Sequence, residues 1–174
     1  MVVSLKHNKN TGFTIVELLV MIAIMGILAA LVAVAYNGIQ GKSRDAIRQN
    51  DVSLIVKALQ VYNKDNGDYA QAGCGNGTGT GYFSSDYDGT GPNKSVSACL
   101  TDGGYLTNVL VDPSGRLSCS GLSCHTYMKA SCAAGTFVYA HLENKPNTTT
   151  DTDGTCQSTW DTGYGVNYYV KVDL

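Results

Sequence analysis

Phe13–Tyr36 reads FTIVELLVMIAIMGILAALVAVAY, and this stretch decides how the 174-residue chain is organised. It contains no Lys, Arg, Asp, Pro, Asn or Gln, and its one charged side chain is Glu17. A helix of this length spans roughly 36 Å, which is enough to cross a hydrocarbon core of about 30 Å. The stretch is therefore predicted to be a membrane-spanning helix.

Glu17 separates the possible functions of this apolar stretch. A carboxylate costs roughly 2.5–3.5 kcal/mol at the centre of a bilayer on insertion scales, so it needs a partner or a route to the headgroups. In a simple signal anchor, Glu17 would extend to the headgroups. In a cleaved secretory signal, Ala33–Ala35 would be the cleavage motif. However, the apolar run Leu18–Ala35 is longer than the usual apolar region of such a signal, about 7–15 residues, and the acid stays unexplained.

The residues around the start of the apolar stretch favour a third interpretation. Gly12 follows a short polar leader with two lysines and a histidine, MVVSLKHNKNT, and precedes Phe13-Thr-Ile-Val-Glu17. This arrangement closely resembles the prepilin signal of the type IV pilin and pseudopilin family, and the close resemblance covers residues 12–70. It implies cleavage after Gly12 by a prepilin peptidase, N-methylation of Phe13 by the same enzyme, and a role for Glu17 in assembly.

A second helical segment, residues 37–66, is predicted to continue the first without a break, because no proline interrupts it. Apolar residues fit one face of this segment: Ile39, Ile47, Leu54, Ile55, Ala58, Leu59 and Tyr62. The opposite face is predicted to be polar, with Lys42, Arg44, Asp45, Arg48, Asp51, Lys57 and Lys64. Gly38 and Gly41 each weaken the helix by about 1 kcal/mol relative to Ala, so a joint is possible there. Asn66-Gly67 is predicted to end the helix, since Gly readily adopts a left-handed conformation.

Residues 67–174 are predicted to form a small β domain that covers the apolar face of residues 37–66. They hold all three prolines and most glycines, which indicates short strands and long loops. β-prone runs predict three strands, at His125–Ala130, Thr136–Glu143 and Tyr164–Val172.

Alternation along the strands separates their two faces, one of which is expected to be buried against the helix. In the middle predicted strand, Val138, Ala140 and Leu142 share one face. In the last predicted strand, the residues that share one face are Val166, Tyr168, Val170 and Val172. The fold class is therefore α+β, a long N-terminal helix on a small antiparallel sheet, and the order of these segments loosely resembles that of pilins.

Six cysteines lie in this domain: Cys74, Cys99, Cys119, Cys124, Cys132 and Cys156. An even number on one side of a membrane segment indicates disulfides formed outside the cytoplasm. Sequence proximity favours the pairs Cys74–Cys99, Cys119–Cys124 and Cys132–Cys156. The glycine-rich residues 73–98 are expected to be a surface loop held by the first pair.

Motifs for catalysis and metal binding are weak. The chain has no G-x-S-x-G, no H-E-x-x-H and no phosphate loop, so an enzyme is not expected. Cys119, Cys124, His125 and Cys132 could bind zinc, but they lack a paired C-x2-C motif. Asp86-Tyr-Asp88-Gly and Asp151-Thr-Asp153-Gly place oxygens as calcium loops do, without the later Glu of an EF-hand. A structural calcium at Asp151 and Asp153 is a weak expectation, and no other cofactor is expected.

The function predicted from these features is that of a filament subunit. Residues 1–12 would be a cleaved leader, 13–36 a membrane and filament-core helix, 37–66 an amphipathic helix and 67–174 the disulfide-rich domain. Small residues at Ala23, Gly26, Ala29, Ala30 and Ala33 allow helices to approach closely. Before assembly, the resemblance implies a single-pass protein of the cytoplasmic membrane; afterwards, it implies a surface filament.

The resemblance implies four kinds of partner: copies of the chain, a prepilin peptidase, an assembly ATPase and a platform protein. Several disulfides and a long loop favour a type IV pilus for adhesion, motility or DNA uptake over a pseudopilin of a type II secretion-like system. A single-pass anchored extracellular binding protein is the alternative of another class. Lys and Arg number 12 against 14 Asp and Glu, so composition gives no sign of nucleic-acid binding.

Overall fold

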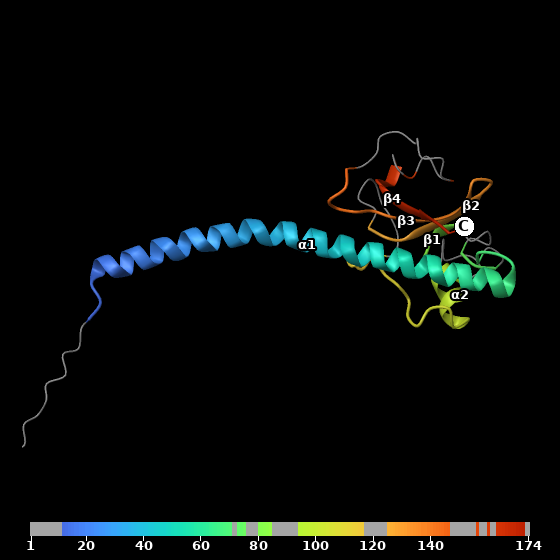
Figure 1. Ribbon diagram of the computed structural model, residues 1–174, viewed down its shortest axis with the longest axis horizontal. Helices are drawn as coiled ribbons and strands as arrows, with labels where there is room; N and C mark the ends of the chain where they lie inside the picture. Colours follow the sequence, from blue (N-terminus) through green and yellow to red (C-terminus); the bar gives the residue numbers. More distant parts are fainter. Residues whose placement is uncertain are drawn as a thin grey trace, which may run out of the picture. The chain divides into compact units, whose positions relative to one another are not determined.

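The computed structural model describes residues 12–70, 73–75, 80–84, 94–116, 125–146, 156, 160 and 163–172. Within these residues the elements are α1 (Ile15–Asn66), β1 (Gly81–Tyr82), α2 (Val96–Asp102), β2 (Met128–Cys132), β3 (Gly135–Ala140) and β4 (Tyr168–Lys171). Figure 1 shows them along the chain. The α+β class predicted from the sequence is confirmed, with a long helix and a small antiparallel sheet.

The chain divides into two units, residues 1–40 and residues 41–174. In the first unit, every residue from 12 to 33 is exposed. α1 is long and apolar enough, by length and composition, to cross a membrane, and an 18-residue window in it has a mean hydropathy of 3.0. An apolar surface of this size is unstable in water, so it requires a cover of lipid or protein.

In the second unit, strands β1 to β4 form one antiparallel sheet in that order. One side of the sheet packs on α1 through a cluster centred on Ile55 and Leu59, which are completely buried. Val138 and Ala140 of β3 and Val172 complete the sheet side of this cluster. α2 adds Val96 and Leu100, so the short helix is part of the same core.

The other side of the sheet is also buried, which differs from the expectation that one face would be covered. Met128, Phe137, Tyr139 and Trp160 form a second cluster there with their neighbours. The ring of Tyr139 contacts the ring of Trp160 edge-on, with centroids 5.2 Å apart. Since alternate side chains of β2 and β3 supply both clusters, these strands lie between two apolar layers.

The predicted faces are wrong in detail at two places. Ile39, Ile47 and Leu54 are 63%, 45% and 41% exposed. Within the second unit, the sheet covers the side of α1 that carries Ile55 and Leu59, and Ile47 and Leu54 lie outside this core. Val166 packs in the second cluster instead of beside Tyr168, because β4 begins at Tyr168 and the alternation does not extend back to it.

The predicted end of the long helix is confirmed. α1 stops at Asn66, and Gly67 follows with φ +79°. The Gly67 amide donates to the Asn63 carbonyl over 2.8 Å. Residues 73–98, expected as an irregular loop, contain β1 and the start of α2 among their described part. Ser95 caps α2 by accepting from the Ala98 amide, a signal that the glycine-rich composition obscured.

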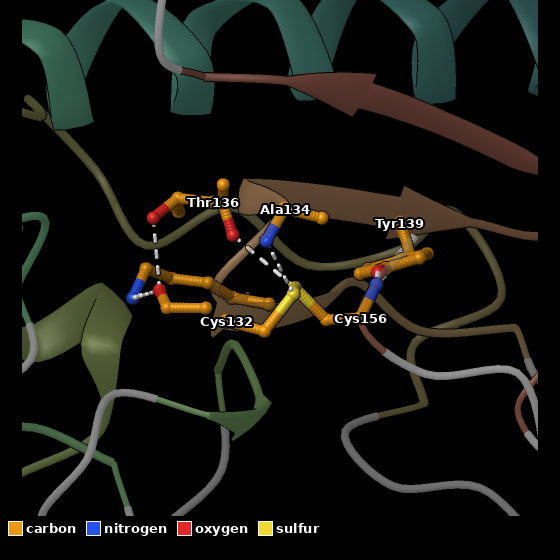
Figure 2. The surroundings of a disulfide bond; sticks show 8 residues. Cys132, Ala134, Thr136, Tyr139 and Cys156 are labelled. Atoms are coloured by element: carbon orange, nitrogen blue, oxygen red, sulfur yellow. Dashed lines mark hydrogen bonds between the residues drawn. A yellow bond between two sulfur atoms is a disulfide. The ribbon is translucent and has the colours of Figure 1, made fainter. Parts of the chain in front are cut away.

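Two disulfides join the described cysteines, and they are pairs that sequence proximity predicts. Cys74 is bonded to Cys99 of α2, and Cys132 at the end of β2 is bonded to Cys156. Figure 2 shows the second bond, where the Cys156 amide donates to the Tyr139 hydroxyl over 3.2 Å. No described cysteine is free. The pair Cys119–Cys124 lies outside the described residues and stays a prediction.

Replacing Cys132 and Cys156 together by Ser is expected to lower the free energy of unfolding by about 3 kcal/mol, from the chain entropy of a loop of this size. Urea unfolding of the full-length chain in non-ionic detergent, followed by the fluorescence of Trp160, measures the loss. The double variant at Cys74 and Cys99 is a matched control, since the two loops span 25 and 24 residues. An unchanged unfolding midpoint in the Cys132/Cys156 variant would contradict the expectation.

Candidate functional site

The first functional segment is the start of α1, where Thr14 and Glu17 cap the helix reciprocally. The Thr14 amide and hydroxyl both donate to Glu17 Oε2 at 2.8 Å. In return, the Glu17 amide donates to Thr14 Oγ1 at 3.2 Å. This is a capping box, in which two of the amides left unpaired at a helix start are satisfied. Glu17 therefore has a role within its own chain.

The capping box leaves Glu17 able to bind a further partner. A carboxylate offers about four acceptor positions, and Thr14 occupies only one oxygen of Glu17. Its negative charge also lies in the first turn of α1, where the helix macrodipole favours an anion. Phe13, four residues earlier, is 80% exposed. The segment thus presents an acid and an apolar side chain together at one end of the helix.

Gly12 immediately precedes this segment. A Cβ atom added at Gly12 would meet nothing within 4 Å. The same is true of Gly26 in the apolar part of α1. Packing among the described residues therefore does not require glycine at either position.

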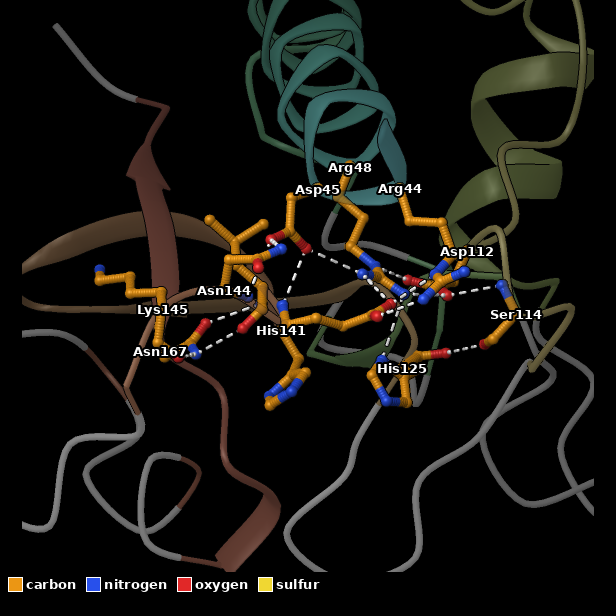
Figure 3. Close-up of polar contacts among 12 residues, drawn as sticks. Arg44, Asp45, Arg48, Asp112, Ser114, His125, His141, Asn144, Lys145 and Asn167 are labelled. Atoms are coloured by element: carbon orange, nitrogen blue, oxygen red, sulfur yellow. Dashed lines mark hydrogen bonds and ion pairs between the residues drawn. The ribbon is translucent and has the colours of Figure 1, made fainter. Parts of the chain in front are cut away.

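The second candidate site is a buried polar cluster between α1 and the sheet, shown in Figure 3. We define the Arg48 cluster as Arg44, Asp45, Arg48, Asp112, His125 and Glu143. Arg48 is 0% exposed at its centre. Its Nε donates to Asp112 Oδ2 at 2.6 Å, and its Nη2 donates to Asp112 Oδ1 at 3.1 Å. Its Nη1 donates to Asp45 at 3.0 Å and to Glu143 at 2.8 Å.

These contacts shift the pKa values of the charged groups in the directions that strengthen the ion pairs. Burial opposes the charged form of Arg48, but its hydrogen bonds to Asp112 and Glu143 outweigh this effect and raise the pKa of the guanidinium. Burial likewise opposes ionisation of Asp112, while the bond from Arg48 holds the pKa of that carboxyl below its ordinary value. The bond from Arg44 lowers the pKa of Glu143 to about 2.

The Arg48 cluster fixes the segment that follows β3. Asp45 accepts from the Glu143 and Asn144 amides at 2.8 and 2.9 Å. On the other side, Asn167 accepts from the Leu142 amide at 2.8 Å and donates to the Lys145 carbonyl at 2.7 Å. Residues 142–145 are therefore held between α1 and the segment before β4.

Gly41 of α1 lies close to residues 143 and 144 of this segment. A Cβ atom there would lie 3.1 Å from Asn144 Nδ2, tighter than an ordinary contact. By contrast, a Cβ atom at Gly38 would meet nothing within 4 Å. The glycine at position 41 is thus explained by close approach of residues 143 and 144.

The burial of the Arg48 cluster corrects the sequence analysis. Asp45, Arg48 and Asp51 were expected on the exposed polar face of α1, but they are 7%, 0% and 8% exposed. Arg48 lies between two acids, Asp45 and Asp51, each three residues away. This spacing is the local signal of the cluster, but it is also typical of exposed ion pairs on a helix surface. Asp51 accepts from the Tyr127 hydroxyl at 2.6 Å, which satisfies it inside the core.

The weak metal candidates gain no support. Cys132 is bonded to Cys156, which removes it from the zinc set with Cys119, Cys124 and His125. Asp86, Asp88, Asp151 and Asp153 lie outside the described residues. Among the residues that are described, no group of three His, Cys, Asp or Glu side chains could hold a metal ion.

The capping box is a site that sequence reasoning missed although the sequence spells it. Thr14-x-x-Glu17 matches the S/T-x-x-E pattern that precedes a helical apolar run. From the sequence, Glu17 was assigned a role in assembly, and Thr14 was not considered as its partner. Both roles are compatible, because a carboxylate can accept from Thr14 and from a second cation at the same time.

Comparison with known proteins bears on the first segment most directly. Residues 7–33 match the family described as Prokaryotic N-terminal methylation motif. The chain is 29% identical over 111 residues to the type II secretion system core protein G of Vibrio cholerae, covering 64% of this chain and 70% of that protein. The chain therefore carries a prepilin-type N-terminal motif.

Two further relatives have the same description. The type II secretion system core protein G of Pseudomonas aeruginosa is 32% identical over 62 residues, which cover 36% of this chain and 44% of the relative. That of Klebsiella michiganensis is 41% identical over 68 residues, covering 37% of this chain and 46% of the relative. The chain thus aligns with less than half the length of these two relatives. No solved structure is a significant match to the chain.

Proposed function

We propose that this chain, which carries the prepilin-type methylation motif and resembles pseudopilins, is a structural subunit of a pilin-like filament in a type II secretion-like system. The observation that carries the proposal is the exposed apolar part of α1, which lies within the matched motif. The relatives are core proteins of secretion systems, which favours this function over the pilus that the cysteines and the long loop suggested.

The physical basis is the need to cover the apolar helix. In a bilayer, lipid covers residues 13–33, and all backbone groups of the helix are paired internally. Outside the bilayer, the same surface must be buried against other helices, and copies of the chain offer the same apolar surface. Gly26, Ala29 and Ala33 permit close approach in such a bundle. An assembly ATPase and a platform protein would move the subunit from one environment to the other.

A surface pilus is the second candidate, favoured by the disulfides, which suit exposure outside the cell. Deletion of the gene separates the two functions. If the chain is a pseudopilin, deletion should make secreted proteins accumulate inside the cell envelope while surface filaments persist. If the chain is a pilin, the surface filaments should disappear while secretion continues. Electron microscopy measures the filaments, and mass spectrometry of the medium measures secretion.

Processing after Gly12 would produce the mature subunit, with a methylated amine on Phe13. Gly12→Val is expected to leave a precursor that is longer by the leader, because a branched side chain blocks the peptidase. A Cβ atom at this position meets nothing within 4 Å, so the substitution should not disturb the described part of the chain. Gly12→Ala, which adds only one methyl group, is the control and should be processed at least in part. Mass spectrometry of the N-terminus measures both, and normal processing of Gly12→Val would exclude the proposed cleavage site.

Glu17 would act in assembly by pairing with the Phe13 amine of a neighbouring subunit. Cleavage creates this positive charge at a helix N-terminus, where the macrodipole disfavours a cation. Burial of either charge alone in a filament core would cost several kcal/mol. The pair would therefore stabilise the assembled state and set the axial register of adjacent subunits.

A further inference from the structure

The Arg48 cluster contains one imidazole ring, that of His125. Arg48 Nη2 lies 3.2 Å from His125 Nδ1. A guanidinium can only donate, so Nδ1 of His125 accepts and its proton is on Nε2. His125 is therefore neutral in this arrangement, because a protonated imidazole has no acceptor nitrogen.

A second histidine fixes the other side of the ring. His141 Nδ1 lies 2.5 Å from the Gly165 carbonyl oxygen, which can only accept, so His141 donates there. The rings of His125 and His141 meet edge-on, with centroids 4.7 Å apart. His125 is thus held between a guanidinium from α1 and an imidazole from the segment after β3 (Figure 3).

We propose that His125 makes the Arg48 cluster a proton-sensitive clasp. In a mildly acidic medium, a proton at Nδ1 removes the acceptor of Arg48 and puts two cations in contact. The ring must then turn away, and the contacts that hold residues 142–145 and Asp112 on α1 weaken. The clasp concerns the stability of the folded unit and does not depend on the proposed function.

The charges around His125 come from three elements. α1 supplies Arg48, Arg44 and Asp45; the segment after α2 supplies Asp112; the segment after β3 supplies His141 and Glu143. The carboxylates attract a protonated ring, but each already accepts from an arginine. Burial lowers the pKa of His125, and His141 and Arg48 act in the same direction, against Asp112 and Glu143.

The sign of the pH effect follows from this depressed pKa. Between the folded and unfolded pKa values, the unfolded chain binds the extra proton, so stability falls as the pH falls below about 6.5. For one such group, the ratio of folded to unfolded protein drops at most about tenfold between about pH 7.5 and about pH 5.5. Carboxylates contribute little in this interval, because their ordinary pKa values are near 4.

The test compares two single variants of the full-length chain in non-ionic detergent, by urea unfolding followed through Trp160. His125→Asn places an amide oxygen near the position of Nδ1, which keeps an acceptor for Arg48 without a titrating ring. His141→Asn keeps a donor for the Gly165 carbonyl and is the matched control. In the parent and in His141→Asn, the ratio of folded to unfolded protein is expected to drop several-fold as the pH falls. In His125→Asn, this ratio should stay nearly constant.

Two results would overturn the proposal. One is that the stability of His125→Asn depends on pH as strongly as that of the parent. The other is that the pH dependence of stability disappears in both variants. If His125→Asn does not fold, an NMR titration of the parent decides instead. A His125 pKa below the ordinary 6.5 supports the clasp, and a value at or above it refutes the clasp.

Discussion

Glu17→Ala is expected to insert into the membrane and to be cleaved after Gly12, but to enter filaments poorly or not at all. Insertion should not suffer, because the substitution removes a charge that costs roughly 2.5–3.5 kcal/mol at the centre of a bilayer. Assembly should suffer, because the neighbour's Phe13 amine would be buried without its partner, at a cost of several kcal/mol. The fraction of subunit in sheared filaments, against the fraction left in the membrane, measures the effect.

The capping box complicates the alanine variant, and Glu17→Gln resolves the difficulty. Alanine removes both the charge and the cap that binds Thr14, and losing such a cap costs about 1 kcal/mol. Glutamine keeps the cap, since Gln replaces Glu in capping boxes, but it removes the charge. If Glu17→Gln assembles like the parent while Glu17→Ala does not, the acid serves its own helix and the proposed pairing between subunits is wrong.

Arg48→Ala is expected to lower the free energy of unfolding by about 3–5 kcal/mol, the range for removing one partner of a buried ion pair. The variant leaves Asp45, Asp112 and Glu143 facing one another, with only the half-exposed Arg44 still bound to Glu143. Two of these carboxylates are almost completely buried, so solvent compensates little of the loss. Urea unfolding through the single Trp160 measures it, because this ring packs against Tyr139 in the second cluster.

Two controls separate charge from geometry at this position. Arg48→Lys keeps the charge but cannot form the paired bonds to Asp112, so its loss should be intermediate. Lys57→Ala removes an exposed cation from the same helix and should change stability by less than about 0.5 kcal/mol. A loss in Arg48→Ala no larger than in Lys57→Ala would mean that the cluster contributes nothing to stability.

The features that the sequence predicts well are those that short stretches of chain decide. The apolar run after Gly12 specifies a helix that must leave water, because its composition alone fixes its hydration cost. Asn66-Gly67 ends α1, because Gly67 reaches positive φ without strain. The bonded cysteines are only 24 and 25 residues apart, and at this range proximity in sequence approximates proximity in space.

Burial on the second half of α1 required the tertiary structure. Asp45 and Arg48 have the pattern of an exposed ion pair, while Ile47 and Leu54 have that of a buried face, and the structure reverses both. The partners that bury Arg48 are Asp112 and Glu143, which lie 64 and 95 residues away in the chain. No local pattern reports such partners. Charge on a helix face is stable inside a protein only where the folded chain supplies the opposite charge, and only the assembled sheet places Asp112 and Glu143 beside Arg48.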